Sequence, residues 1–262
     1  MTGVSGATDY IELATGGRVA YLHLPGNSPG VLFCTGFNSN MRGTKALALQ
    51  AWCAAQGRQY TRFDYTGHGE SSGKFEDGTI SQWRDDALAV LDRVTDGPQV
   101  IVGSSMGGWI MLLMTLARPE KVTGLVGIAT AADFTESLRT RLLSKAQRRQ
   151  LEEIGYCEIP NCYDDGEPYR IGQQLLDEGR QHLLLDGEIP IDVPVRLIQG
   201  QLDDDVPWAH ALRLMDQLRS ADVELQLIKS GDHRLSNSED LARLTCTLDA
   251  LLENLKAGMQ SV

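Results

Sequence analysis

One short stretch constrains the fold of this chain more than any other. Gly103, Ser105 and Gly107 match the pattern G-x-S-x-G, after an apolar run over 100–102 and before helical spacing over 109–117. A serine at the tip of a sharp strand-to-helix turn takes a strained backbone conformation, and its neighbours two residues away must lack β-carbons. The stretch therefore predicts a nucleophile elbow at Ser105, and not a glycine-rich turn in which that serine only caps a helix.

The rest of the chain alternates between strand-like and helix-like segments. We expect strands at 10–13, 18–24, 31–34, 60–65, 100–102, 122–129, 195–198 and 223–228, and helices at 43–56, 80–94, 109–117, 208–219 and 241–255. Such alternation predicts the α/β class, with a mostly parallel sheet and helices on both faces. Residues 134–190 interrupt the pattern with charged residues and short leucine clusters. We therefore expect a single domain over 1–262 with a small helical cap insertion at about 134–190.

Composition excludes several classes of protein. A length of 262 residues with 42% hydrophobic side chains suffices for one large core, and no apolar run is long enough to span a membrane. The net charge of −11 disfavours nucleic-acid binding, because it repels phosphate. Five cysteines, an odd number without a CxxC pair, suggest reduced thiols and no zinc site. The N-terminal residues resemble neither a secretory signal nor an Arg- and Ser-rich transit peptide, so we expect a cytoplasmic protein.

A serine nucleophile needs a base and an acid, which follow it along the chain in this type of fold. Among the histidines that come late enough, His233 lies in a loop between the last strand and the last helix, whereas His210 lies within a helix. We therefore predict that His233 is the base. The acid comes from three consecutive aspartates over 203–205, of which Asp203 is favoured and the other two could cap the following helix. We interpret His68, in a glycine-flanked turn, as structural.

An oxyanion also needs two backbone N–H donors. One is expected from Met106, the residue after the nucleophile, and the other from the loop after an earlier strand. Phe37 fits the second position, because the preceding Gly36 lets the loop approach the substrate closely.

The insertion at 134–190 is expected to cover the carboxyl ends of the strands, where ligands bind in such sheets. Its leucine clusters, at 142–143, 175–176 and 183–185, could line an apolar acyl channel together with Phe37, Met41, Trp109 and Trp208. The alternative is that these leucines only anchor the insertion. A basic run over 139–149 is interpreted as a solvated face with local ion pairs, the alternative being an arginine that binds an anionic leaving group.

Together these motifs resemble the α/β-hydrolase superfamily. The resemblance is carried by residues 36–37, 63–71, 103–107, 200–207 and 232–233. Finer matches at 41–48, 62–65, 109, 204–208 and 232–234 are similar to the family of the mitochondrial palmitoyl-protein thioesterase and acyl-glucuronide esterase.

The resemblance implies a serine hydrolase of ester or thioester bonds. Its catalytic residues would be Ser105, Asp203 and His233, with neither a metal nor an organic cofactor. The substrate would be a small molecule or an acylated protein, cleaved through an acyl-enzyme. Alternatives on the same scaffold are a short-chain carboxylesterase, a peptidase, a haloperoxidase-like enzyme and a non-catalytic binding module. The last is disfavoured because all three members of the triad are present.

Overall fold

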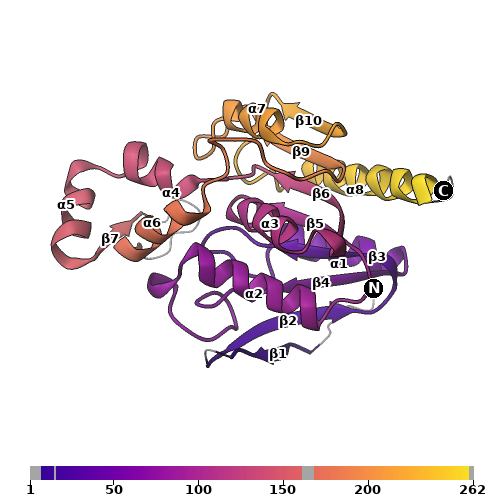
Figure 1. Cartoon of the computed structure of the whole chain (residues 1–262), viewed down its shortest axis with the longest axis horizontal. Helices are drawn as coiled ribbons and strands as arrows, with labels where there is room; N and C mark the ends of the chain where they lie inside the picture. The colour runs from indigo at the N-terminus through magenta and orange to yellow at the C-terminus, as the bar shows by residue number, and fades with distance from the viewer. Residues whose placement is uncertain (1–6, 15, 161–167, 260–262) are drawn as a thin grey trace.

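The computed structural model describes residues 7–14, 16–160 and 168–259, and in this part the expected alternation is confirmed (Figure 1). The strands are β1 (Asp9–Glu12), β2 (Arg18–Leu24), β3 (Asn27–Cys34), β4 (Arg58–Phe63), β5 (Gln99–Ser104), β6 (Val122–Ile128), β7 (Tyr156–Ile159), β8 (Tyr169–Gly172), β9 (Val195–Gly200) and β10 (Val223–Ile228). The helices are α1 (Thr44–Ala55), α2 (Ile80–Arg93), α3 (Met106–Ala117), α4 (Phe134–Ser137), α5 (Lys145–Ile154), α6 (Gln173–Gly179), α7 (Trp208–Gln217) and α8 (Ser238–Met259).

The central sheet is mostly parallel, as predicted. In the described chain its strands follow the order β1-β2-β4-β3-β5-β6-β9-β10. β2 runs antiparallel to both β1 and β4, and the pairs from β4 to β10 are parallel. The carboxyl ends of β3, β5 and β9 therefore meet at one edge, and the loops that follow them carry Phe37, Ser105 and Asp203.

Helices cover both faces of this sheet. Successive residues of a strand point to opposite faces, and β5 shows the consequence. Val100 and Val102 pack in a cluster with Leu49 of α1 and Leu248 of α8. Ile101, between them, packs in a second cluster that contains residues of α2 and α3. The continuous apolar run over 100–102 is thus explained by a strand that is buried on both faces.

The insertion between β6 and β9 differs in one respect from the expected set of helices. It contains α4, α5 and α6, but also the antiparallel pair β7 and β8. Each of these strands is only four residues long, so their alternation did not stand out in a charge-rich segment. Asp133, just before the insertion, is hydrogen-bonded to the end of the insertion. Its carboxylate accepts from the N–H groups of Leu184 and Leu185, each at 2.9 Å.

The structure describes four of the five cysteines. Cys34, Cys53 and Cys157 are buried and Cys246 is exposed, all as free thiols, whereas Cys162 lies outside the described residues. Among the helices of the described ranges, none has both the length and the apolar character needed to cross a bilayer.

His68 is buried in the turn after β4, where we predicted a structural role. Its ring lies among those of Tyr65, Phe75 and Trp83, with centroids 5.0–5.6 Å away. Its Nδ1 is 3.2 Å from the carbonyl oxygen of Thr66. Burial disfavours the charged ring and lowers the pKa of His68 from 6.5 to about 4.

This pKa shift predicts a pH dependence of stability. The unfolded chain takes up the proton below pH 6.5 and the folded chain only near pH 4, so the stabilisation is complete above pH 6.5 and is lost between these values. Its full size is about 3 kcal/mol. We expect the free energy of unfolding, measured in urea, to fall less between pH 7 and pH 4.5 in His68→Gln than in the wild type. Equal losses in both proteins would contradict the assignment.

Candidate active site

Ser105 lies at the turn between β5 and α3 with φ 54° and ψ −119°. This left-handed conformation is strained for a serine, and backbone hydrogen bonds hold it in place. The N–H of Ser105 donates to the carbonyl of Ile128 at 2.9 Å, and its carbonyl accepts from the N–H of Ala131 at 3.0 Å. The elbow is thereby fixed to the end of the neighbouring strand, β6.

The two glycines of the motif are needed for close contacts. A β-carbon on Gly103 would lie 2.5 Å from the carbonyl oxygen of Gly107, and one on Gly107 would lie 2.2 Å from that of Cys34. No side chain can be accommodated at such distances without moving backbone. The first turn of α3 therefore packs directly on β5 and on the end of β3, which brings Ser105 next to the loop that contains Phe37.

The predicted nucleophile, base and acid lie together, although they come from three separate loops. Nε2 of His233 is 3.1 Å from Oγ of Ser105, and Nδ1 of His233 is 2.8 Å from Oδ2 of Asp203. With Nδ1 donating its proton to the carboxylate, Nε2 can accept the proton of the serine hydroxyl. The arrangement can activate Ser105 for attack on an acyl carbon.

The geometry also distinguishes Asp203 from its neighbours. Its side chain is fully buried, and Oδ1 accepts hydrogen bonds from the N–H groups of Asp205 and Val206 at 3.0 and 2.7 Å. Oδ2 accepts from Nε2 of Gln199 at 2.9 Å as well as from His233. Asp204 and Asp205 are exposed. Asp203 is thus the aspartate held against the imidazole.

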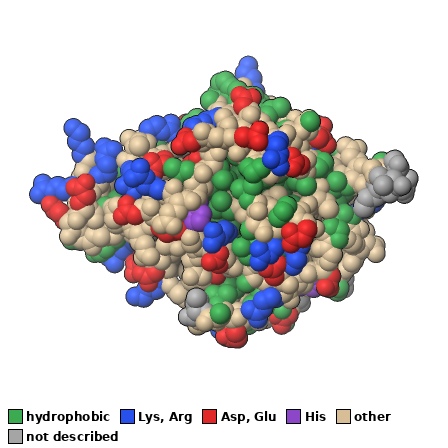
Figure 2. Space-filling view, viewed as in Figure 1, with side chains coloured by type: hydrophobic (Ala, Val, Ile, Leu, Met, Phe, Trp, Pro, Cys, Tyr) green, Lys and Arg blue, Asp and Glu red, His purple; other side chains and the backbone are tan. Residues whose placement is uncertain are grey.

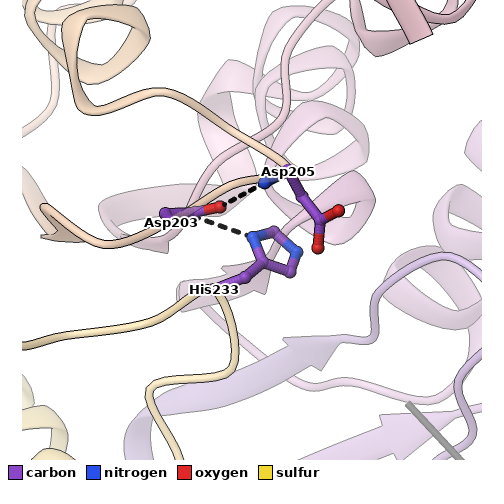
Figure 3. A group of neighbouring side chains, drawn as sticks. All are labelled: Asp203, Asp205 and His233. Atoms are coloured by element: carbon purple, nitrogen blue, oxygen red, sulfur yellow. Dashed lines mark hydrogen bonds and ion pairs between the residues drawn. The ribbon is translucent and has the colours of Figure 1, made fainter. Parts of the chain in front are cut away.

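A metal ion would have to disrupt this arrangement. Within the part of the chain that the structure describes, Asp203, Asp205 and His233 have side-chain atoms that could bind a metal, and these atoms lie within 4.8 Å of one another (Figure 3). Both oxygens of Asp203 already accept hydrogen bonds. The hydrogen bond to Oδ2 involves Nδ1 of His233, one of the nitrogens that a metal ion would need. The donor set therefore suits a hydrogen-bonded acid and base better than a cation site.

The two residues predicted to provide the backbone donors for an oxyanion line the same cavity. Phe37 and Met106 both lie on the wall that contains Ser105. The N–H of Met106 belongs to the first residue of α3, which has no acceptor within its own helix. Four rings surround the side chain of Phe37, those of Phe75, Trp83, Phe134 and Tyr169, with centroids 4.8–5.8 Å away. They hold Phe37 at this position.

Above Ser105 lies a cavity of about 370 Å³ with two unlike sides. The insertion contributes an apolar side formed by Phe134, Leu138, Leu142, Ile159, Tyr169 and Ile171. The loops near His233 and the start of α1 contribute a polar side formed by Asn38, Ser39, Asn40, Lys45, Arg234 and Ser236. The cavity can hold an apolar chain on one side of the serine and a polar group on the other.

Comparison with known proteins identifies the family. A family model described as serine aminopeptidase, S33, matches residues 28–240. The chain belongs to the α/β-hydrolase family. The mouse mitochondrial palmitoyl-protein thioesterase ABHD10 is 42% identical over 238 residues, which cover 91% of this chain and 80% of that protein.

Solved structures agree with this assignment. The mouse α/β-hydrolase domain-containing protein 10 has a TM-score of 0.88 at 39% identity, covering 95% of this chain and all of that one. A putative hydrolase from Agrobacterium vitis has the same TM-score and identity, over 94% of this chain and 98% of its own. The α/β-hydrolase fold and the predicted class, a hydrolase of ester or thioester bonds, are confirmed.

The predicted cytoplasmic location is wrong. The mouse, bovine and human relatives are all named as mitochondrial proteins, at 41–42% identity over 91% of this α/β-hydrolase chain. The expectation depended on the composition of the first residues, of which 1–6 lie outside the described part of the chain.

Three side chains predicted to line the substrate channel do not lie on its wall. Met41 is fully buried in a small cluster beside β2. Trp109 is fully buried in α3, where its indole N–H donates to the carbonyl of His182 at 3.1 Å. Trp208 begins α7 and is 41% exposed, away from the cavity. Their proximity along the chain to site residues was misleading, because side chains that are close in sequence but not one helical turn apart point in different directions.

Most leucines of the insertion anchor it to the core, and its basic run forms local ion pairs. Of the clusters, Leu142 reaches the cavity, whereas Leu143, Leu175, Leu176 and Leu185 are buried in the core. The basic side chains over 139–149 do not line the cavity. Arg139 pairs with Asp177 at 2.7 Å and Arg149 with Glu153 at 2.6 Å. Basic and acidic side chains stand side by side on this end of the molecule, at the left in Figure 2.

Several residues of the cavity were missed by the sequence analysis. Residues 38–40 directly follow Phe37 beyond the carboxyl end of β3, and this position could have identified them. The position of Lys45 in the sequence could not identify it as a cavity residue, because its place on the wall depends on the direction in which α1 leaves the preceding loop. Tyr169 and Ile171 belong to β8, the strand that was not expected.

Proposed function

We propose that this hydrolase cleaves medium- to long-chain acyl thioesters and esters, including those of acylated proteins, with Ser105 as nucleophile, His233 as base and Asp203 as acid. One observation carries the proposal. The hydrogen-bonded series from Asp203 to Ser105, with distances of 2.8 and 3.1 Å, ends at the floor of a cavity with an apolar side. The mouse relative named a palmitoyl-protein thioesterase supports an acyl group of this kind.

The reaction follows from this geometry in two steps. His233 Nε2 takes the proton of Ser105 as Oγ attacks the acyl carbon, and the N–H groups of Phe37 and Met106 donate to the developing oxyanion. The bond to the leaving sulfur or oxygen then breaks, and His233 returns the proton to that atom. A water molecule, activated by the same nitrogen, hydrolyses the acyl-serine ester and releases the carboxylic acid. Asp203 stabilises the imidazolium formed in each step.

The two sides of the cavity support a separate place for each of the two parts of the substrate. The leaving group receives its proton from His233, so it lies on the side formed by the loops near that residue, which is polar. The acyl chain then extends beneath the insertion, along Phe134, Leu138 and Ile171. We propose on this basis that residues 134–190 act as the cap of a single domain, and that this cap selects the acyl chain.

A panel of acyl thioesters and 4-nitrophenyl esters from acetyl to palmitoyl tests this proposal. Each methylene buried on binding contributes about 0.8 kcal/mol at most. We expect kcat/KM to rise several-fold per pair of carbons beyond butyryl. A maximum at acetyl, with octanoyl and palmitoyl substrates untouched, would leave only a short-chain esterase. Hydrolysis of peptide amides in preference to all esters would instead indicate a peptidase.

Two exposed leucines provide a matched pair of variants for the same panel. Leu142 lies on the apolar side of the cavity and is 49% exposed, whereas Leu202 is 64% exposed and lies off the cavity. Leu142→Asn is expected to lower kcat/KM for palmitoyl substrates about fivefold and to leave butyryl substrates unchanged. Leu202→Asn is expected to change neither. Equal effects of the two replacements would argue against an acyl chain beneath the cap.

A further inference from the structure

The loop that carries His233 is held in a strained conformation. Leu235, two residues after His233, has φ 42°, in the left-handed region that a branched side chain rarely adopts. Its side chain is buried in the core beside α8, and its N–H donates to Oδ1 of Asp232 at 2.9 Å. A strained backbone persists only where the surroundings fix it. The position of His233 therefore depends on what holds the residues around it.

Lys45, which lies outside this loop, forms hydrogen bonds to it. It extends from the first turn of α1, and its Nζ donates to the carbonyl oxygen of Arg234 and to Oγ of Ser236, the latter at 3.2 Å. Oγ of Ser236 also donates to the carbonyl of Arg234, at 2.8 Å. The ammonium group thus joins α1 to the backbone of the residue that directly follows His233.

The environment of Lys45 is unusual for a lysine. Its side chain is half-buried on the polar wall of the cavity, and lysines are seldom buried unless they are paired. Burial and the nearby charge of Arg234 lower the pKa of Lys45 to about 8, against the opposite effects of Asp232 and Asp240. The charge of this side chain therefore changes close to neutral pH.

We propose that Lys45 is a positioning residue, which fixes the backbone next to His233 so that Nε2 stays within reach of Ser105. This inference depends on the proposed function of the triad. A lysine suits the role because its long side chain spans the distance from α1 and its ammonium carries three donors. A displacement of about 1 Å in a catalytic base can cost a factor of 10² in rate. Loss of the ammonium should therefore reduce turnover more than substrate binding.

The test compares Lys45→Met and Lys45→Arg with the wild type, using an ester with an uncharged leaving group. We expect Lys45→Met to lower kcat about tenfold or more with KM changed less than twofold. Lys121→Met is the matched control, because Lys121 is also half-buried and pairs with Asp92 at 2.7 Å, far from the cavity. Lys121→Met is expected to leave kcat unchanged, although its thermal stability should fall by about as much as that of Lys45→Met.

The pH profile gives a readout that a purely structural lysine would not move. Below pH 8 Lys45 is charged and its hydrogen bonds are strongest, so wild-type kcat is expected to decline as the pH rises through about 8. Lys45→Arg should recover most of the activity and shift this decline to much higher pH, because arginine remains protonated. If Lys45→Met does not fold, the shift in Lys45→Arg decides alone.

Three results would overturn the proposal. They are an unchanged kcat in Lys45→Met, a decline near pH 8 that persists in Lys45→Arg, and a raised KM with unchanged kcat, which would make Lys45 a substrate contact. The proposed function fails separately, by absence of hydrolysis in the wild type.

Discussion

Ser105→Ala is expected to abolish hydrolysis while the protein remains folded. A triad hydrolase that loses its nucleophile loses about 10⁴-fold or more in kcat. The fold should tolerate the change, because alanine and serine are penalised similarly at the left-handed backbone conformation of residue 105. The measurement is kcat/KM on octanoyl and palmitoyl thioesters, with the thermal midpoint recorded in parallel.

The chain offers a matched control in a second serine that contacts a histidine. Oγ of Ser81 lies 2.7 Å from Nε2 of His182, but Glu178 contacts that same nitrogen at 2.9 Å, and the group is not on the wall of the cavity. Ser81→Ala should therefore keep wild-type activity. Turnover close to wild type in a folded Ser105→Ala protein, or its loss in Ser81→Ala, would contradict the assignment of the nucleophile.

Asp203→Asn is expected to lower kcat by about 10³- to 10⁴-fold. An asparagine can present its amide N–H to Nδ1 of His233, which reverses the tautomer and leaves Nε2 protonated and unable to accept the proton of Ser105. The carboxylate that stabilises the imidazolium is lost as well. Because Asp203 also accepts two backbone N–H groups through Oδ1, the shape of the loop should be retained by the asparagine oxygen.

The neighbouring aspartates are the controls for this variant. Asp204→Asn and Asp205→Asn are expected to lose less than about threefold in kcat, because both side chains are exposed. Asp205 lies beside His233, but it contacts Asp203 through its backbone N–H, which donates to Oδ1 of Asp203 (Figure 3). A greater loss of kcat in either of these variants than in Asp203→Asn would show that the neighbouring aspartate, and not Asp203, is the catalytic acid.

The sheet and the elbow could be predicted from the sequence because they depend on local and repetitive features. Apolar runs such as 100–102 indicate strands buried on both faces, and Gly103 and Gly107 are required by contacts within a few residues. The chain order of nucleophile, acid and base then follows from the topology of a parallel sheet, in which strand ends meet at one edge. His233 could be chosen over His210 for this reason.

The walls of the cavity could not be predicted in the same way. Whether Trp109 faces the cavity or the core depends on the rotation of α3 against the cap, which is set by contacts such as that with the carbonyl of His182. The strands β7 and β8 are four residues each and are stabilised by pairing with each other. Lys45 and Arg234 are 189 positions apart, and only the packing of α1 brings them together.

In the proposed reaction Ser105 forms the covalent acyl-enzyme. This role of Ser105 is tested most directly by reaction with a fluorophosphonate, followed by mapping of the modified peptide by mass spectrometry. We predict one adduct per chain, located on Ser105, absent in Ser105→Ala and much slower to form in His233→Ala. An adduct on Ser81 or another serine, or an unmodified wild-type protein that still hydrolyses acyl thioesters, would contradict the account.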